Sequence, residues 1–456
     1  MILGAGLFVG GCGKKHSASS WSLDKSGAST QLKQFVAAQE IQALALAKQD
    51  GNKLPSEFDA FYKAAETGDW QVATNLFGQM RKRLDGESSL LGSWWSATLD
   101  AYGIFELFPP GDKYAIAFGN GIIQSIPAGS IYFGGTDPGR FVVTALMESH
   151  VDGKPFFMLS QNPLADATYL HYLRAMYGGK IYTPTDKDLQ KSLQDYMTGA
   201  QRRLTHDQQF PNEPKQLKLG DEDVKQDSNG QIQLRSHWGV IGVRELLTKT
   251  IFDKNPDREF YIEESFPLDW MYPYLEPHGL IMKINRQPLS ALSDEIVQRD
   301  RDYWTQYLTP MIGGWLKPDT TIDDVAAFAE KIHVKKDLSG FAGDPQFVQS
   351  EYWCENFSKL RSSIGGLYEW RARNSHDAAE KKRMNDAAEF AFRRAWALCP
   401  YSPETVLRYV SLLTSQNRRA DALLVAETAA KMPEMKGNGQ LHDLVTVLGN
   451  SNTKFK

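Results

Sequence analysis

The sequence predicts an α/β fold: a mainly parallel sheet domain flanked by helices, with an N-terminal helical hairpin region and a C-terminal α-helical array. Between residues 109 and 288, short runs rich in β-branched and aromatic residues alternate with amphipathic helical segments, as in βαβ units. Helical periodicity prevails on either side of that stretch. The 456 residues, 42% of them hydrophobic, suffice for two or three domains with a large core.

The composition is that of an ordinary globular protein. Lys and Arg number 51 against 55 Asp and Glu, which gives a net charge of −4 and no basic footprint for nucleic acid. Nucleic acid is therefore not an expected partner. The 11 Trp, 18 Tyr and 23 Phe suit a large core or, alternatively, platforms that face carbohydrate.

Residues 1–30 have the pattern of a bacterial lipoprotein signal followed by a tether. An apolar run with small residues ends at Gly11, Cys12 follows, and a polar stretch begins at Gly13. This pattern predicts lipidation of Cys12 and a membrane-anchored, extracytoplasmic protein of the periplasm or outer envelope. No basic residues precede the apolar run, so a plain signal, a single anchor or an ordinary terminus are alternatives. No later segment has the ~18 consecutive apolar residues that span a bilayer.

Residues 31–108 are predicted to be helical. The segment 31–48 has one apolar face, a Gly-Asn-Lys break follows it, and a second helix is expected over 55–67. Around Gly68-Asp69, the apolar spacing predicts a helix–turn–helix pair that resembles a tetratricopeptide repeat. A generic αα-hairpin is the alternative.

Residues 109–288 are predicted to form the α/β domain. Six short runs are expected to be strands: 114–118, 130–133, 156–159, 232–234, 259–262 and 280–284. Three segments between them have helical periodicity: 165–177, 186–203 and 239–252. The stretch 210–229 is rich in Pro, Lys, Asp and Gly, which favours a surface loop.

Residues 289–456 are predicted to be helical, with helices over 294–308, 322–335 and 346–364 and tetratricopeptide-like repeats over about 386–448. The segment Ala-Leu-Cys-Pro at 397–400 has a similar counterpart, Ala-Lys-Met-Pro, 33 residues later at 430–433. Amphipathic helices are expected over 403–414 and 420–431. An unrelated helical bundle is the alternative. A repeat array would offer a groove for a protein partner. Cys354 and Cys399 lie in this region, and the sequence leaves open whether they pair.

The glycine-rich stretch 134–140 is the first candidate site. It follows a predicted strand and precedes an apolar helix, the position where α/β proteins bind ligands. Gly134 and Gly135 allow close backbone approach, while Thr136, Asp137 and Arg140 could bind a metal, hydroxyl or phosphate. The alternative is purely structural: Asp137 caps backbone N–H groups and Arg140 pairs locally. The glycine spacing matches neither a dinucleotide fingerprint nor a Walker loop.

Two further candidate segments follow the carboxyl ends of predicted strands, and they are expected to lie close to the stretch 134–140 if the order of the strands is simple. Gln161, Asn162 and Asp166 have side chains suited to the hydroxyl groups of a sugar or headgroup, with helix capping by Asn162 and Asp166 as the alternative. Glu263 and Glu264 could serve as a base or as metal ligands, with a solvated loop as the alternative.

Other chemistries lack their motifs. The sequence has no His-x-His, His-Glu-x-x-His or Cys-x-x-Cys spacing, so a zinc site is not expected. It has no Gly-x-Ser-x-Gly, which disfavours an α/β-hydrolase. No cofactor is predicted.

Three motifs resemble the soluble extracytoplasmic tail of an uncharacterised bacterial membrane family. They are Gly-Gly-Thr-Asp-Pro-Gly-Arg-Phe at 134–141, Leu-Ser-Gln-Asn-Pro-Leu-Ala-Asp-Ala-Thr-Tyr at 159–169 with Tyr172-Leu173, and Glu-Pro-His-Gly-Leu-Ile-Met-Lys-Ile at 276–284. Proteins of that family begin with a polytopic region similar to type C glycosyltransferases of the protein O-mannosyltransferase kind, and often end in tetratricopeptide repeats. The catalytic acid and the polyprenyl-linked donor site belong to that region, which this sequence lacks. The resemblance therefore implies acceptor or partner handling rather than glycosyl transfer.

Two functions follow as expectations. The first is a non-catalytic envelope lipoprotein that binds a glycan, a lipid-linked sugar or a protein, accessory to surface glycosylation or envelope assembly. The alternative is an enzyme acting on a sugar- or phosphate-bearing envelope substrate, with Asp137 as base or metal ligand and Arg140 clamping an anion.

Overall fold

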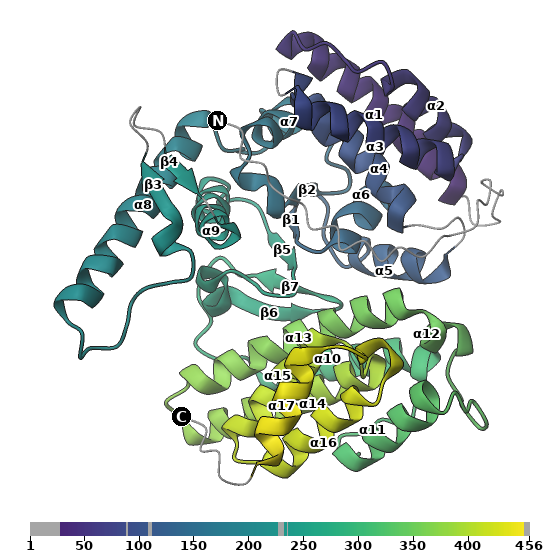
Figure 1. Cartoon of the computed structure of the whole chain (residues 1–456), viewed down its shortest axis with the longest axis vertical. Coiled ribbons are helices and arrows are strands. Elements are labelled where there is room, and N and C mark those ends of the chain that lie inside the picture. Colours follow the sequence, from purple (N-terminus) through teal and green to yellow (C-terminus); the bar gives the residue numbers. More distant parts are fainter. Residues whose placement is uncertain (1–27, 88–89, 108–111, 227–231, 235, 451–456) are drawn as a thin grey trace. The chain divides into compact units, whose positions relative to one another are not determined.

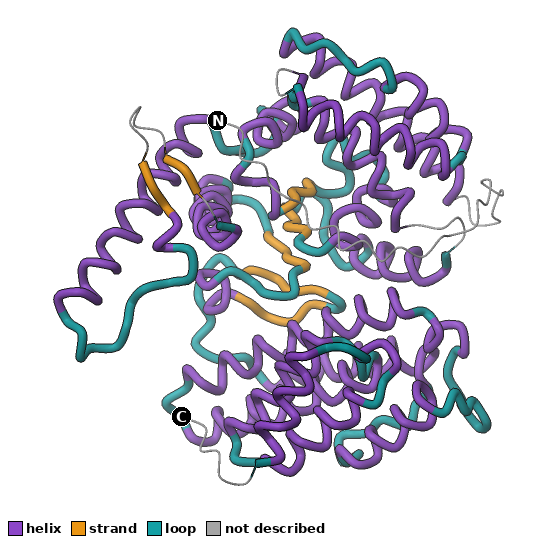
Figure 2. Tube along the Cα trace, viewed as in Figure 1, coloured by secondary structure: helices purple, strands orange, loops and turns teal. Residues whose placement is uncertain are grey.

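The computed structural model describes residues 28–87, 90–107, 112–226, 232–234 and 236–450. Cys12 and the predicted lipoprotein signal lie outside these residues. The described chain is mostly helical, with 67% helix and a small mixed sheet (Figure 2). The predicted combination of helices and a sheet is thus confirmed, but helices dominate and the sheet is small and mixed, with β1 and β2 parallel and β6 and β7 antiparallel.

The chain divides into two compact units, Met1–Phe260 and Tyr261–Lys456, called here the N-terminal and C-terminal units. The division falls within strand β5 (Phe260–Glu263). The four-part domain division expected from the sequence remains a prediction.

The N-terminal unit is built mainly of helices (Figure 1). Its α-helices are α1 (Ala28–Asp50), α2 (Phe58–Thr67), α3 (Trp70–Gly86), α4 (Trp94–Leu107), α5 (Lys113–Ile123), α6 (Val143–Leu146), α7 (Ala167–Tyr177), α8 (Asp186–Gln209) and α9 (His237–Lys254). Its shorter elements are β1 (Ile131–Gly134), η2 (Pro138–Val142), β2 (Phe157–Ser160), η3 (Asn162–Ala165), η4 (Asp221–Asp223), β3 (Val224–Gln226) and β4 (Ile232–Leu234).

Helices α2 and α3 form the predicted helix pair. Gly68 ends α2 with a φ of 75°, which glycine adopts at little cost, and the Asp69 side chain accepts a hydrogen bond from the Val72 N–H at the start of α3. The pair packs through aromatic rings, and Phe77 of α3 stacks on Tyr102 of α4 with ring centroids 3.7 Å apart. The α2–α3 pair therefore packs against α4, the next helix in the chain.

The predicted strand over residues 114–118 is wrong, because this segment lies inside α5. The Asp112 carboxylate accepts hydrogen bonds from the N–H groups of Tyr114 and Ala115 and so caps a helix. Buried residues then recur at three-to-four spacing at Ala115, Phe118 and Ile122. A short apolar run cannot be assigned to strand or helix by its hydrophobicity alone, and here the cap decides.

Strands β1 and β2 lie side by side and run parallel, with Gly134 aligned on Ser160. All four residues of each strand are buried, as expected for a parallel pair covered on both faces. The predicted strand over 232–234 is β4, which pairs antiparallel with β3 in a separate two-stranded sheet.

The C-terminal unit is also mainly helical. Its α-helices are α10 (Asp294–Ile312), α11 (Ile322–Ala329), α12 (Pro345–Gln349), α13 (Glu351–Asn374), α14 (Ala378–Leu398), α15 (Pro403–Ser415), α16 (Arg419–Ala430) and α17 (Gly439–Gly449). Its other elements are η5 (Asp269–Tyr274), β6 (Leu275–His278), β7 (Ile281–Ile284), η6 (Glu330–Val334) and η7 (Pro433–Met435).

The five-stranded sheet has the order β2-β1-β5-β7-β6, with β6 and β7 antiparallel. Sequence reasoning missed β6, which contains Pro277. Proline removes a donor from a strand and is therefore tolerated mainly at a sheet edge, where β6 lies.

The last helices of the chain follow one another as contacting neighbours, from α13 to α17. The turn between α15 and α16 lies at Asn417, whose φ of 61° is left-handed, a conformation that asparagine tolerates better than most residues. This arrangement agrees with the predicted helical array. The tetratricopeptide-like character of these helices stays a prediction.

Candidate functional site

The loops after β1 and β2 meet, as the sequence predicted. The Gln161 N–H donates to the Gly134 carbonyl at 2.9 Å, and Asn162 Nδ2 donates to the Gly135 carbonyl at 3.1 Å. Because the strands are parallel, their carboxyl ends share one edge of the sheet. Gly134, Gly135, Gln161 and Asn162 are therefore brought together.

The loop after β1 is folded tightly on itself. A Cβ atom at Gly134 would lie 3.0 Å from the Gly139 carbonyl oxygen and 2.7 Å from Met158 Cε, so a larger residue would force a shift. The Thr136 hydroxyl accepts from the Gly139 N–H at 3.2 Å. Thr136, rather than Asp137 as the structural alternative had it, provides this cap, since Asp137 makes no capping hydrogen bond.

Arg140 does not face a ligand at this edge. It lies in η2, a π-helical turn, and its side chain is buried against Asp100 of α4, with Nη2 and Oδ1 2.7 Å apart. Burial opposes the charge of Arg140, but the Asp100 carboxylate outweighs that effect and raises the pKa of Arg140. The structural alternative expected Arg140 to pair with a residue nearby in the sequence. Its partner is instead Asp100, which lies 40 residues earlier in the chain.

Asp100 lies at the centre of a buried polar network. The Tyr172 hydroxyl donates to Asp100 Oδ2 at 3.0 Å and lies 3.4 Å from His150 Nε2. The Tyr177 hydroxyl lies 3.1 Å from His150 Nδ1. Burial lowers the pKa of His150 to about 4, Asp100 opposes that shift, and Arg140 adds to it. The network is at most about 5% exposed, so it supports the loop from beneath and offers no surface.

Three polar side chains of the predicted set remain accessible at this edge. Asp137 and Asn162 are exposed, and Thr136 is partly exposed. Asn162 Oδ1 also accepts a hydrogen bond from Arg244, a buried residue of α9 that sequence reasoning missed. Asp137 and Asn162 thus present a carboxylate and an amide held on a rigid support.

The other candidates in this unit have structural roles. Asp166 caps α7, because its carboxylate accepts from the Thr168 N–H at 2.8 Å, which confirms the capping interpretation for this residue. Gln161 is only 1% exposed. Gln161 therefore does not offer its side chain at the surface, and the partly exposed Asp166 uses its carboxylate for the cap.

Glu263 and Glu264 belong to the C-terminal unit. Glu263 is the last residue of β5 and is 1% exposed. The Glu264 carboxylate accepts from the Ser265 N–H at 2.8 Å, and the Glu264 carbonyl accepts from the Ser363 hydroxyl at 2.6 Å. The predicted solvated loop is therefore wrong for Glu263, and Glu264 is tied to α13.

Side chains of α13 and α15 bind the part of the chain that follows β5. Arg408 of α15 donates to the Ser265 carbonyl, and its guanidinium lies 3.9 Å from the Phe266 ring centroid. Arg371 of α13 donates to main-chain carbonyls of η5 and β6, among them that of Pro273 at 2.9 Å. The face of α13 and α15 that carries these arginines is thus occupied by the chain itself.

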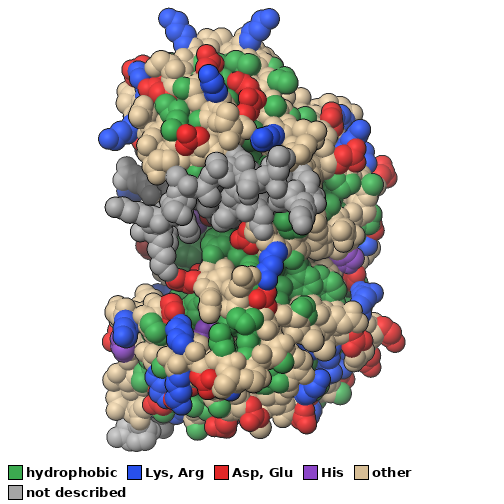
Figure 3. Space-filling view, turned by 90° about the vertical axis from the view of Figure 1, so that its right-hand side faces the viewer, with side chains coloured by type: hydrophobic (Ala, Val, Ile, Leu, Met, Phe, Trp, Pro, Cys, Tyr) green, Lys and Arg blue, Asp and Glu red, His purple; other side chains and the backbone are tan. Residues whose placement is uncertain are grey.

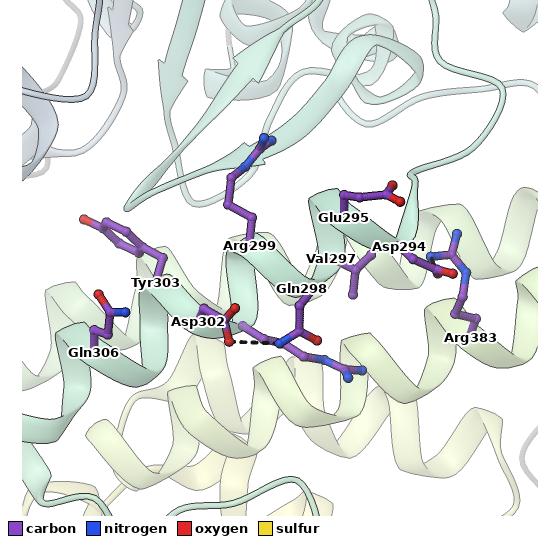
Figure 4. Close-up of a pocket in the computed structure, with 10 residues that line it drawn as sticks. Asp294, Glu295, Val297, Gln298, Arg299, Asp302, Tyr303, Gln306 and Arg383 are labelled. Atoms are coloured by element: carbon purple, nitrogen blue, oxygen red, sulfur yellow. Dashed lines mark hydrogen bonds and ion pairs between the residues drawn. The ribbon is translucent and has the colours of Figure 1, made fainter.

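A groove alongside α10 is a second candidate site, and sequence reasoning missed it (Figure 4). Its volume is about 890 Å³, and all its lining residues belong to the C-terminal unit: Asp294, Glu295, Val297, Gln298, Arg299, Arg301, Asp302, Tyr303, Gln306 and Arg383. The only sequence signal was a helix with a long polar face.

The described residues contain no candidate metal centre and no candidate membrane span. No group of three or more His, Cys, Asp or Glu side chains among them could hold a metal ion. None of the helices in that part of the chain combines the length and the apolarity that crossing a bilayer requires.

Comparison with known proteins identifies no relative. The sequence matches no family model, no curated protein and no solved structure.

Proposed function

We propose that this chain is a non-catalytic envelope protein that binds a glycan or a polyprenyl-linked sugar and assists surface glycosylation or envelope assembly. The observation that carries this proposal is the burial of Arg140 and its ion pair with Asp100. The enzyme alternative needed Asp137 and Arg140 to act on one ligand, but Asp137 is exposed whereas Arg140 is buried and paired with Asp100. The anion clamp of that alternative therefore loses its support.

The ligand-contacting edge in this proposal consists of Thr136, Asp137 and Asn162. Carboxylate, hydroxyl and amide groups together accept and donate hydrogen bonds, which suits the hydroxyl groups of a sugar. The buried network around Asp100 supports the loop after β1, and Arg244 orients Asn162. Such preorganisation lowers the entropic cost of binding.

The lipid anchor at Cys12 and the extracytoplasmic location are part of this proposal. They rest on the apolar run, the small residues and the cysteine at the start of the sequence. The family resemblance adds the role of handling an acceptor or partner.

A protein partner of the C-terminal helices is the second component of the proposal. The tetratricopeptide-like pattern over residues 386–448 favours it. Because the loop after β5 occupies the side chains of Ser363 and Arg408, the partner would have to use another face of the array.

A thermal-shift panel tests the ligand. The protein is melted with neutral sugars, sugar nucleotides, polyprenyl-phosphate headgroup analogues and divalent cations, beside Asp137→Ala and Asn162→Ala. A ligand at 100 times its Kd stabilises by about 2.7 kcal/mol, which raises the Tm by several degrees. Asp152→Ala, at another exposed carboxylate of the same unit, is the matched control.

We expect a sugar-dependent shift that both site variants lose and the control keeps. A shift that requires a divalent cation and disappears in Asp137→Ala would favour the enzyme. No shift with any compound would leave protein binding by the C-terminal helices as the remaining function.

A further inference from the structure

The groove beside α10 lies next to β6, the turn between β6 and β7, and α14. One wall is the exposed face of α10, and Tyr303 on that face contacts the turn between β6 and β7, where a Cβ atom at Gly279 would lie 3.3 Å from Tyr303 Cζ. Arg299 reaches to within 4.0 Å of Glu276 on β6. Arg383 of α14 closes one end through an ion pair with Asp294, 2.7 Å long.

The groove is elongated. Figure 4 shows Tyr303 and Gln306 at one end and Asp294 with Arg383 at the other. At 1.5 Å per residue, the distance along α10 from Asp294 to Gln306 is about 18 Å. A chain of several linked rings fits this length better than a single small molecule does.

The charges of the groove balance. Its lining contains three carboxylates, Asp294, Glu295 and Asp302, and three guanidinium groups, Arg299, Arg301 and Arg383. A polyanion would meet the carboxylates and a polycation the guanidinium groups, so electrostatic complementarity favours a ligand without strong net charge.

The groups in the groove both donate and accept hydrogen bonds. The amides of Gln298 and Gln306 and the hydroxyl of Tyr303 lie among the charged side chains, and Gln298 donates to Asp302 at 2.9 Å. Burial raises the pKa of Tyr303 to about 12, so its hydroxyl remains a donor. Val297 is the only aliphatic side chain in the lining, which favours a ligand that hydrogen-bonds over a peptide held by apolar anchor residues.

We propose that the α10 groove is a second binding site and that it takes a neutral oligosaccharide, whose hydroxyl groups hydrogen-bond to Asp302, Gln306 and Tyr303. Closely spaced acceptors and donors on a shallow surface match neighbouring hydroxyl groups on successive sugar rings. This site is independent of the edge at Asp137, and either one can exist without the other.

Isothermal titration calorimetry of the full chain tests this site. The probes are neutral oligomers of glucose, mannose and N-acetylglucosamine, each compared with its monomer. The groove variant is Asp302→Ala with Gln306→Ala, two exposed side chains whose removal leaves the core intact. The matched control is Thr309→Ala, which is exposed on the same helix beyond the groove lining.

We expect one oligomer class to bind more tightly than its monomer and to lose at least tenfold in affinity in the groove variant. The control and Asp137→Ala should bind as the parent does. Binding that is lost in Asp137→Ala but kept in the groove variant would overturn this inference and support the edge instead. Binding of no oligomer at all would overturn it too, whereas the polyprenyl-phosphate analogues test the edge separately.

Discussion

Arg140 and Asp100 form an ion pair inside the N-terminal unit, with Nη2 and Oδ1 2.7 Å apart and both side chains about 5% exposed. The pair joins η2, which follows the candidate loop, to α4. Tyr172 donates a further hydrogen bond to Asp100. The loop that presents Asp137 is therefore supported by a charge that lies 40 residues away in the sequence.

Breaking this pair should destabilise the N-terminal unit strongly. Asp100→Ala leaves the Arg140 guanidinium buried without its carboxylate, which costs about 3–5 kcal/mol. Urea unfolding followed by fluorescence measures the loss. The double variant Asp100→Asn with Arg140→Met, which removes both charges, should be more stable than Asp100→Ala. If the two variants were equally unstable, the charge pairing would not be the cause.

Acid should weaken the C-terminal unit through His333. This residue is 1% exposed, and burial together with the smaller effect of Lys336 lowers its pKa to about 4. Its pKa in the unfolded chain is near 6.5, so the unfolded state takes up the proton first as the pH falls. The contribution of His333 is therefore complete above about pH 6.5 and is lost as the pH falls to about 4.

Between about pH 6.5 and pH 4, this effect of His333 lowers the free energy of unfolding by about 3 kcal/mol. Chemical unfolding between pH 7 and pH 4 measures it, and His333→Phe should reduce the pH dependence by that amount while keeping the ring contact with Tyr401. His376→Gln, at an exposed histidine, is the control. An unchanged pH dependence in His333→Phe would contradict the prediction.

The thiols of Cys354 and Cys399 should resist alkylation in the folded protein. Both are fully buried and unpaired with each other, and burial raises the pKa of Cys354 to about 12. In a Cys12→Ser background, we expect no reaction with Ellman's reagent in buffer and reaction of both thiols in denaturant. Two unreactive sulfurs in denaturant would instead indicate a disulfide.

Arg408 should restrain the loop after β5. Arg408→Ala removes the hydrogen bond to the Ser265 carbonyl and the contact with the Phe266 ring. A lost charge-assisted hydrogen bond of about 1.5 kcal/mol corresponds to roughly tenfold faster local opening. Hydrogen–deuterium exchange of the peptide covering residues 264–268 measures the opening rate.

The neighbouring exposed residue supplies the control for that experiment. Leu407→Ala, on the same helix, should leave exchange of residues 264–268 unchanged. Equal acceleration in both variants would point to a general loosening of α15 rather than to loss of the Arg408 contacts.

The sequence by itself determined the local structure where short-range signals were present. Apolar periodicity placed α7, α8, α9 and the later helices, and apolar runs after turn residues placed β1, β2, β5 and β7. The meeting of the loops after β1 and β2 also followed, because parallel strands end at one edge. Helix caps and periodicity act over a few residues and can be read directly.

Only the tertiary structure decided which polar groups face a ligand. Arg140 lies in a glycine-rich loop that suggested anion binding, yet α4 places Asp100 within reach and buries the pair. Likewise, Ser363 and Arg408 bind the loop after β5, and the lining of the α10 groove includes Arg383 from a different helix. Charge pairing and groove shape depend on elements far apart in sequence, and no pattern in a single segment specifies which of them will meet.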